Sequence, residues 1–346
     1  MLPMGLFRRV ALCLAVALFA ALLTPLWGPA AAQPSADDVV RVGIIGLDTS
    51  HSPAFTELIN TSDAGLFGAF EVVAAYPKGS LVIESSYSRI PRYTEAVQGF
   101  GVEIVDSIEA LLDRVDVVLL ETNDGQRHLE QVLPVLEAGK PVFVDKPIAA
   151  SLADAVRIFD AAEEHGVPLF SASSLRYAKN ALAVRRGEQI GEVVGATTYS
   201  PALLEPHHPD LFWYGIHGVE LLYTVMGTGC ETVTRVSTDG TDVVVGTWAD
   251  GRIGTFRGMR TGPHDYGGTA FGAEEIVPLG PYQGYEPLVK DILAFFKTGE
   301  PPVSREETLE IYAFMAAADA SKRQGGAPVR IQRVLDDARA AANRSN

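Results

Sequence analysis

A carboxylate and a lysine behind a short apolar run are the residues of this chain best suited to acid–base chemistry. The run Val142–Val144 reads as a buried strand, and Asp145 and Lys146 follow it directly. Ligands of open α/β sheets bind at the carboxyl ends of strands, and Pro147 holds Lys146 in a turn there. Lys146 is therefore placed for function as well as for solubility. The alternative is a surface lysine in an ordinary strand-to-helix turn.

The chain around these residues alternates short strands with helices. Strands are expected at residues 39–45, 70–76, 102–105, 115–120 and 142–144, and helices at 52–60, 107–114, 127–138 and 151–165. Residues 77–92 contain Gly, Ser and Pro and are expected to form a loop over the site. This alternation predicts a right-handed, doubly wound parallel sheet, which is a Rossmann-like domain over residues 38–172.

The pattern changes after residue 173. Strands are expected at residues 193–200, 231–238, 242–248 and 252–259, with hairpin turns at Asp239-Gly240 and Asp250-Gly251. A helix is expected at 218–226, and two more at 285–296 and 305–324. These elements predict an α+β domain with an open antiparallel sheet over residues 173–300, followed by C-terminal helices over 301–333.

The polar residues near the predicted site follow a recognisable pattern. The chain has Glu121-Thr122-Asn123-Asp124 after one strand, His128 in the next helix, Ala138-Gly139-Lys140 at its end, and then Asp145-Lys146-Pro147. In this order and spacing the chain resembles the Gfo/Idh/MocA oxidoreductases, the glucose–fructose oxidoreductase and inositol dehydrogenase family. The resemblance implies hydride transfer between a sugar or polyol and NAD or NADP, with Lys146 as the general base. It also makes Asp145, which replaces the family's Glu, a predicted catalytic residue. It also implies that residues 301–333 return to the first domain and that the chain forms a dimer or tetramer.

The loop after the first strand departs from the dinucleotide-binding pattern. Gly-x-Gly-x-x-Gly is expected there, but Asp48 and His51 stand at the second and third glycine positions. A carboxylate repels phosphate unless it points away or carries a metal. Either the helix N-terminus after Ser50 still binds a pyrophosphate through its N–H groups, or the fold has lost the cofactor. The predicted cofactor-binding residues are Gly46, Asp48, Thr49, Ser50, Asn123 and Lys146.

A second motif of the resembled family lies further along the chain. The family pattern Asp-x-Gly-x-His matches at His217, which makes this histidine a catalytic candidate, but Trp213 stands at the position of the acid. Tyr214 or Asp210 could take the place of that acid, and an aromatic ring here could stack on a sugar face. The alternative places Trp213 and Tyr214 in the core, with His217 only capping its helix.

Two further residues match positions that lie near the substrate in the resembled family. Glu220 falls where a further acid usually follows the histidine, and Arg176 matches an arginine that faces the substrate cleft. A surface ion pair is the alternative for the arginine. The predicted substrate residues are Arg176, Trp213, Tyr214 and Glu220.

The adjacent His207 and His208 are the candidates for a metal. Two imidazoles in a polar loop can ligate an ion, but this spacing matches no zinc template, so no metal site is predicted. A metal site would require histidines from both domains to converge over the crevice. The residues that would have to meet are Asp48, His51, His207, His208 and His217.

The N-terminus has the features of a cleavable signal peptide over residues 1–32. Arg8 and Arg9 precede an apolar run, Val10–Leu23, and Ala30–Ala32 offers small residues for cleavage. We predict export to the periplasm or the extracellular space, with weak twin-arginine character and no membrane segment after cleavage. The formal charge of −15 argues against nucleic acid or an anionic membrane as partner. Cleavage would leave Cys230 as the only cysteine, which excludes an intramolecular disulfide.

Together these features predict an exported oxidoreductase that acts on a sugar or polyol through NAD(P). NAD(P) is not readily regenerated outside the cytoplasm, so a cofactor that is recycled within each turnover is favoured. Two alternatives stay open. One is a cofactor-free or metal-assisted sugar lyase or glycosidase, and the other is a non-catalytic carbohydrate-binding or scaffold protein.

Overall fold

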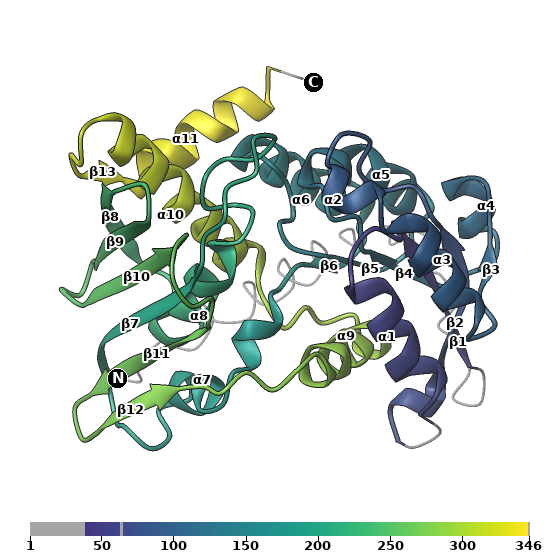
Figure 1. The fold of residues 1–346 in the computed structure, drawn as a ribbon, viewed down its shortest axis with the longest axis horizontal. Coiled ribbons are helices and arrows are strands. Elements are labelled where there is room, and N and C mark those ends of the chain that lie inside the picture. The colour runs from purple at the N-terminus through teal and green to yellow at the C-terminus, as the bar shows by residue number, and fades with distance from the viewer. Residues whose placement is uncertain (1–38, 63–64, 345–346) are drawn as a thin grey trace, which may run out of the picture. The chain divides into compact units, whose positions relative to one another are not determined.

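The computed structural model describes residues 39–62 and 65–344, which form two sheets with helices around them (Figure 1). The first sheet is parallel and the second is mixed, so the predicted fold class is confirmed. The predicted signal peptide, residues 1–32, lies outside the described residues. Within the described part of the chain, no helix combines the length and apolarity that a membrane crossing requires.

The parallel sheet has the strand order β3-β2-β1-β4-β5-β6. Its strands are β1 (Val40–Ile45), β2 (Phe70–Tyr76), β3 (Glu103–Ile104), β4 (Val117–Leu120), β5 (Val142–Val144) and β6 (Leu169–Phe170). The chain runs outward from β1 to β3 and then returns across β1 to β4. This reversal places a crevice between the carboxyl ends of β1 and β4, where doubly wound sheets bind their ligands.

Helices cover both faces of this sheet, which explains why its strands are apolar on both sides. One face packs against α4 (Ile108–Leu112), α5 (Gly125–Glu137) and α6 (Leu152–His165), and the other against α1 (His51–Asn60), α3 (Ile90–Gln98) and α9 (Glu286–Thr298). Along β4, Val118 and Leu120 join the first layer and Val117 and Leu119 the second. Ser107 and Ser151 cap α4 and α6 with side-chain acceptors.

The segment after β2 differs from the loop expected over residues 77–92. It contains the short helix α2 (Glu84–Tyr87), and α3 begins at Ile90. Pro91 is one of the prolines of the expected loop, but it stands in the first turn of α3, where a proline interrupts no helical hydrogen bond. The non-helical part, residues 77–83, still reaches the carboxyl edge of the parallel sheet.

The second sheet has the order β12-β11-β7-β10-β9-β8-β13. Its strands are β7 (Val193–Pro201), β8 (Cys230–Ser237), β9 (Thr241–Trp248), β10 (Ile253–Met259), β11 (Gly267–Gly272), β12 (Ile276–Leu279) and β13 (Val329–Arg330). The two predicted hairpins join β8 to β9 and β9 to β10. The sheet is not wholly antiparallel, however, because β10 pairs with β7 in parallel. The long connection through α8 (Ile216–Met226) makes that parallel pairing possible.

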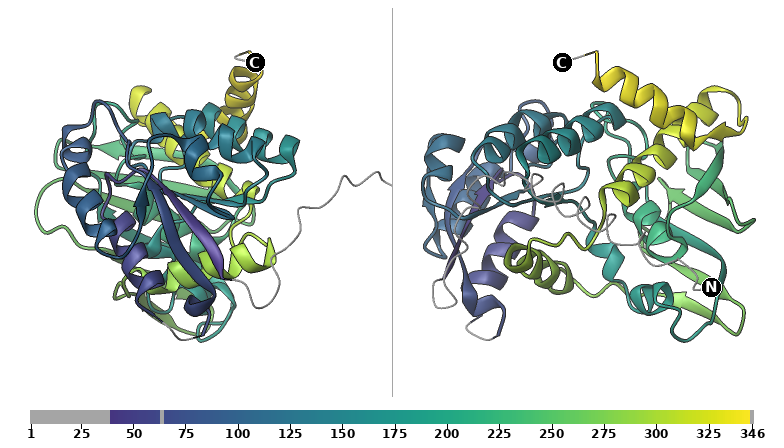
Figure 2. Two further views of the ribbon diagram at one scale, coloured as in Figure 1. Left: turned by 90° about the vertical axis from the view of Figure 1, so that its right-hand side faces the viewer. Right: turned by 180° about the vertical axis from the view of Figure 1, so that it is seen from behind.

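The last helices contact elements of both sheets. α10 (Arg305–Arg323) packs on β8, α8 and α6, and Figure 2 shows it between the two sheets. α11 (Ile331–Ala342) also packs on α6 and continues beyond residue 333, the predicted limit of this region. The hydroxyl of Tyr312 accepts a hydrogen bond from the backbone N–H of Ile148 at 2.6 Å. These contacts attach the mixed sheet to the Rossmann domain beside the carboxyl end of β5.

Candidate active site

Three titratable side chains meet at the carboxyl ends of β4 and β5, and we call them the His51 cluster: His51, Glu121 and Asp145. Glu121 directly follows β4, Asp145 directly follows β5, and His51 is the first residue of α1. Nδ1 of His51 lies 2.9 Å from Oδ2 of Asp145 and 3.7 Å from Oε2 of Glu121. His51 is 5% exposed, and both carboxylates are fully buried. The predicted catalytic Asp145 therefore shares its site with a second acid and a histidine.

The charges of the cluster depend on one another. Burial disfavours the charged form of His51, but the carboxylates of Asp145 and Glu121 overcome this and raise its pKa to about 10. Burial, reinforced by the negative charge of Asp145, raises the pKa of Glu121. Burial also opposes the ionisation of Asp145, yet the positive charges of His51 and Lys146 lower its pKa. In the absence of another cation, the cluster retains a proton at neutral pH.

Lys146 and His217 lie in the electrostatic field of this cluster. Lys146 is 9% exposed, and its backbone N–H donates to Oδ1 of Asp145 at 2.7 Å. Burial, together with the positive charges of Lys146 and His51, lowers the pKa of His217 well below its usual value. Nδ1 of His217 lies 2.7 Å from the hydroxyl of Ser173. The structure thus brings the three predicted catalytic residues together, with His217 held in its neutral form.

Tyrosine rings surround the His217 side of the site. His217 packs edge-on against Tyr214 and Tyr266, with ring centroids 5.9 and 5.8 Å apart. Tyr285 packs against His51 at 4.7 Å. Tyr214 and Tyr285 are half-buried, so part of each ring remains accessible to a ligand.

The predicted phosphate position is occupied by a feature that we call the Asp48 bridge: Asp48, Ser80 and Asn123. The carboxylate of Asp48 is fully buried and accepts the backbone N–H of Ser80 at 2.7 Å and that of Asn123 at 2.9 Å. Burial raises the pKa of Asp48, and the two N–H donors offset this only in part. Asp48 therefore links the loops that follow β1, β2 and β4.

Further side chains hold the segment after β2 over this crevice. The hydroxyl of Ser80 donates to Asp124, and the amide of Asn123 donates to the hydroxyl of Ser86, each at 2.8 Å. Gly79 packs so closely on Asp48 that a Cβ added there would lie 2.1 Å from Oδ2. The chain's own polar groups thus fill the crevice.

Part of the dinucleotide pattern fits and part does not. Gly46 has φ +90°, and its close approach to Thr122 leaves no space for a side chain, as the first glycine of the pattern requires. Thr49 is buried, while Ser50 is exposed before α1 and makes no side-chain cap. The carboxylate of Asp48 holds the backbone N–H groups of Ser80 and Asn123, which belong to the neighbouring loops. A pyrophosphate at this loop would have to displace that carboxylate or meet its charge.

Arg176 and Glu220, two predicted substrate residues, are paired with each other. Nε of Arg176 donates to Glu220 at 3.0 Å, and its Nη2 donates to Glu307 at 2.6 Å. Arg185 binds the other side of Glu307. All three residues of the chain Glu220–Arg176–Glu307 are buried, so the pairing holds α8 and α10 together. Their contact with a substrate stays a prediction.

The adjacent histidines do not form a shared metal site. His207 is exposed and pairs with Glu205 at 2.7 Å. His208 is buried: its Nε2 accepts the backbone N–H of Gly125 at 3.1 Å, and its ring packs 4.9 Å from that of Trp213. Burial lowers the pKa of His208 to about 4. The five residues considered above for a metal site therefore do not meet at one point. His51 and His217 lie near the same charged side chains, whereas Asp48, His207 and His208 have other partners.

His128 has a positioning role. Its ring nitrogens contact the carbonyl oxygens of Thr122 at 2.6 Å and Ile148 at 3.2 Å. These carbonyls belong to the loops after β4 and β5. His128 therefore fixes the two loops that carry Glu121 and Lys146.

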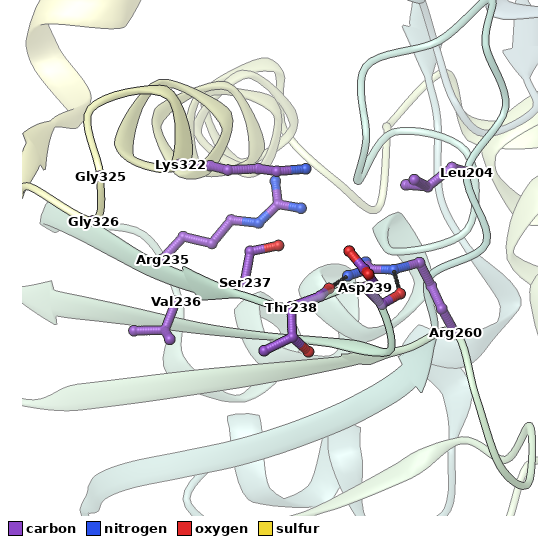
Figure 3. A pocket seen from close by; sticks show the side chains of 10 residues that line it. All are labelled: Leu204, Arg235, Val236, Ser237, Thr238, Asp239, Arg260, Lys322, Gly325 and Gly326. Atoms are coloured by element: carbon purple, nitrogen blue, oxygen red, sulfur yellow. Dashed lines mark hydrogen bonds between the residues drawn. The ribbon is translucent and has the colours of Figure 1, made fainter.

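A separate cavity of about 530 Å³ lies on the mixed sheet (Figure 3). Arg235, Arg260 and Lys322 line it, but each is paired with a carboxylate. Asp210, considered above as a substitute acid, binds Arg235 at 2.9 Å and Lys322 at 2.6 Å. Asp210 therefore serves this ion network and does not reach the His51 cluster.

Sequence reasoning missed Glu121, Ser80 and Ser173. Glu121 carried a usable signal, because an acid directly after a buried parallel strand must stand at the ligand-binding edge. Ser80 and Ser173 carried none, since a serine in a loop is common and its partner is distant in sequence.

The parallel sheet and its helices form a Rossmann-type domain, which is joined to a mixed-sheet domain. Residues 40–173 match the model of a family described as an oxidoreductase family with an NAD-binding Rossmann fold, GFO_IDH_MocA. The predicted family is thereby confirmed, and the Rossmann domain of this chain belongs to Gfo/Idh/MocA.

Two curated relatives match the chain over part of its length. A 1,5-anhydro-D-fructose reductase of Ensifer adhaerens is 36% identical over 157 residues, 41% of this chain and 46% of the relative. An inositol 2-dehydrogenase 3 of Saccharopolyspora erythraea is 34% identical over 141 residues, 40% of this chain and 36% of the relative. The matches span less than half the length of either relative.

Solved structures match nearly the whole fold. A probable dehydrogenase from Thermotoga maritima has a TM-score of 0.69 and 22% identity, covering 85% of this chain and 100% of that one. A myo-inositol dehydrogenase from Lactobacillus casei, in complex with NAD(H) and myo-inositol, has a TM-score of 0.67 and 18% identity, covering 84% and 96%. At this identity the likeness establishes the shared fold.

Proposed function

We propose that this protein is an exported NAD(P)-dependent oxidoreductase that acts on a sugar or polyol. The observation that carries the proposal is Lys146 at the carboxyl end of β5, in a domain that matches an NAD-binding oxidoreductase family. The names of the two curated relatives, a sugar-derivative reductase and an inositol dehydrogenase, support a polyhydroxylated substrate. The basic and apolar pattern of residues 1–32 supports export.

The side chains around Lys146 supply acid–base groups for this reaction. Lys146, once it has given up its own proton, takes the proton of a substrate hydroxyl, and its low exposure keeps that exchange away from bulk water. His217 is neutral and is held by Ser173, so its ring can orient a substrate hydroxyl through a hydrogen bond. Asp145 fixes the backbone of Lys146. Acceptance of the hydride is the chemistry that a bound nicotinamide would supply.

The covered crevice supports a cofactor that stays bound between turnovers. A dinucleotide can reach the loop after β1 only if Ser80 and Asn123 release Asp48. The same barrier would slow its exchange with free nucleotide. Retention suits an exported enzyme, because the cofactor then needs no regeneration by a second enzyme.

The Asp48 bridge also favours a second candidate, a cofactor-free or metal-assisted lyase acting on sugars. If the bridge never opens, the buried acids and bases remain available for proton abstraction and elimination. Lys146 would then serve as the base in either reaction.

Product analysis distinguishes the two candidates. The purified protein is incubated, with and without added NAD or NADP, with a panel of sugars, polyols and glycosides, and the products and any reduced nucleotide are identified by mass spectrometry. An oxidoreductase gives a product that has lost a hydrogen pair, or a glycoside cleaved without net oxidation when nucleotide is bound. A lyase gives an unsaturated product in nucleotide-free protein. The absence of any product would contradict both.

A further inference from the structure

The His51 cluster has the composition and arrangement of a metal site. It offers one imidazole nitrogen and two carboxylate groups, a donor set that suits divalent transition metals. The three donors come from α1 and from the loops after β4 and β5, so three separate elements fix their positions. One ligand atom from each of the three residues lies within 4.8 Å of the other two.

The oxygens of the cluster lack partners. Apart from the close approach of His51, neither oxygen of Glu121 nor Oδ2 of Asp145 has a hydrogen-bond partner among the residues that the structure describes. Both side chains are fully buried. A buried carboxylate without donors is costly, and such groups are usually paired with a cation or coordinate a metal.

The distances suit a small ion. A tetrahedral zinc with bonds of about 2.0–2.2 Å separates its ligand atoms by roughly 3.3–3.6 Å. The separations of Nδ1 from the two carboxylates, 2.9 and 3.7 Å, bracket that range. We propose that His51, Glu121 and Asp145 bind one divalent transition-metal ion, with zinc as the first ion to test.

Neighbouring groups orient these ligands. Oδ1 of Asp145 accepts the N–H of Lys146, which leaves Oδ2 for the ion. The His51 ring is stacked on Phe55 with centroids 5.1 Å apart and packs edge-on against Tyr285. Three protein ligands leave a tetrahedral ion one open position for water or a substrate oxygen, as in catalytic zinc sites.

The test measures bound metal and does not depend on nucleotide or on turnover, so its failure is distinct from failure of the proposed function. The protein is purified without a histidine tag, stripped with a chelator, mixed with one equivalent of zinc and desalted. Bound zinc is measured by plasma mass spectrometry and the melting temperature by calorimetry. Cobalt in place of zinc gives an absorption spectrum that reports nitrogen and oxygen ligands.

Two variants and two controls make the test specific. Glu121→Gln keeps the side-chain volume and removes one ligand, and His51→Gln removes the imidazole. Asp48→Asn alters a buried carboxylate at the same edge of the sheet but outside the cluster, and His207→Ala removes an exposed histidine–glutamate pair that could bind zinc adventitiously. Circular dichroism checks that each variant is folded.

We expect the wild-type protein and both controls to retain about one zinc per chain and to melt higher with zinc, because an ion bound only by the folded state stabilises it. The affinity of Glu121→Gln should fall at least about tenfold, and the zinc-dependent rise in melting temperature should disappear. Wild-type protein that retains no zinc and shows no rise would overturn the proposal, and its cluster would then hold only a proton. Unchanged zinc affinity in a folded Glu121→Gln protein would overturn it equally.

Discussion

The Asp48 bridge and the His51 cluster lie at the same edge of one sheet. The buried carboxylate of the bridge has hydrogen-bond donors, whereas that of Glu121 in the cluster has none within the part of the chain that the structure describes. Asp48 accepts two backbone N–H groups, and the segment that supplies one of them packs directly on it. Glu121 accepts no hydrogen bond from the described residues, and Nδ1 of His51 lies 3.7 Å from its Oε2. The burial of the two carboxylates is the same, and the difference lies in their partners.

The comparison separates structural acids from functional ones. A carboxylate whose oxygens are satisfied by backbone donors stabilises the fold and needs no ligand. A carboxylate left without donors raises the energy of the folded state until a proton, a cation or a ligand arrives. Removing Asp48 should therefore cost stability, whereas removing the charge of Glu121 should cost function.

The largest effect is expected for Lys146→Ala on turnover. Lys146 is the base assigned to both candidate reactions, and loss of a general base lowers kcat by about 10²–10⁴-fold. The rate of product formation is compared with that of Lys297→Ala, which removes an exposed lysine in the last turn of α9. Equal rates in the wild-type and Lys146→Ala proteins would break the assignment.

Asp48→Ala is expected to lower the free energy of unfolding by about 2–5 kcal/mol, because the buried N–H groups of Ser80 and Asn123 lose their acceptor. Urea unfolding measures the change. Asp48→Asn, which keeps one acceptor oxygen, should lose less. A loss under about 0.5 kcal/mol in the alanine variant would show that the bridge does not stabilise the fold.

Acid should lower the free energy of unfolding of the protein through the titration of His208. Its pKa in the folded protein is about 4, below the 6.5 of the free side chain. Between these values the unfolded chain binds more protons, so the stability that neutral His208 contributes is lost as the pH falls from about 6.5 towards 4. The expected loss is on the order of 1–3 kcal/mol. Urea unfolding of His208→Gln, which accepts from Gly125 but does not titrate, should show a flatter profile; identical profiles would contradict the expectation.

Gly79→Ala sharpens the account of the bridge, because the new methyl would lie 2.1 Å from Oδ2 of Asp48. We expect a loss of about 1–3 kcal/mol in the wild-type background. In an Asp48→Ala background the methyl has space, so a double-mutant cycle should give a coupling energy of about 1–2 kcal/mol. Additive losses would mean that Gly79 and Asp48 act independently.

Glu121→Gln is expected to change the stability of metal-free protein by less than about 1 kcal/mol, because the substitution breaks no hydrogen bond that the fold makes to Glu121. Chemical unfolding measures the stability of Glu121→Gln and of Asp48→Asn side by side. Both substitutions change a carboxylic acid to its amide, and the two positions are equally buried. A loss as large as that of the Asp48 variant would erase the distinction between the two sites.

Local patterns in the sequence predicted the elements of the fold well. Apolar runs gave the strands of the parallel sheet, Asp239-Gly240 and Asp250-Gly251 gave two hairpins, and Ser107 and Ser151 gave two caps. The elements that were missed carry weak local signals. α3 has a proline in its first turn, and β11 is bounded by glycines whose pairing depends on β7 and β12.

The site residues could be predicted from the sequence only where they directly follow a predicted strand. Lys146 and Asp145 could be predicted because they directly follow β5. The partners of Asp48 could not, since Ser80 is 32 residues away and Asn123 is 75 residues away, and both donate through the backbone. For the same reason Arg176 and Glu220 appeared as separate substrate residues, although folding pairs them across 44 positions.

The most direct test of the account is to purify the protein without added cofactor, denature it and identify any released nucleotide by mass spectrometry. An oxidoreductase that retains its cofactor between turnovers should release NAD or NADP at about one molecule per chain. Release of no nucleotide, together with no binding of added NAD or NADP, would contradict the proposed function and leave the Asp48 bridge as a permanent closure of the crevice.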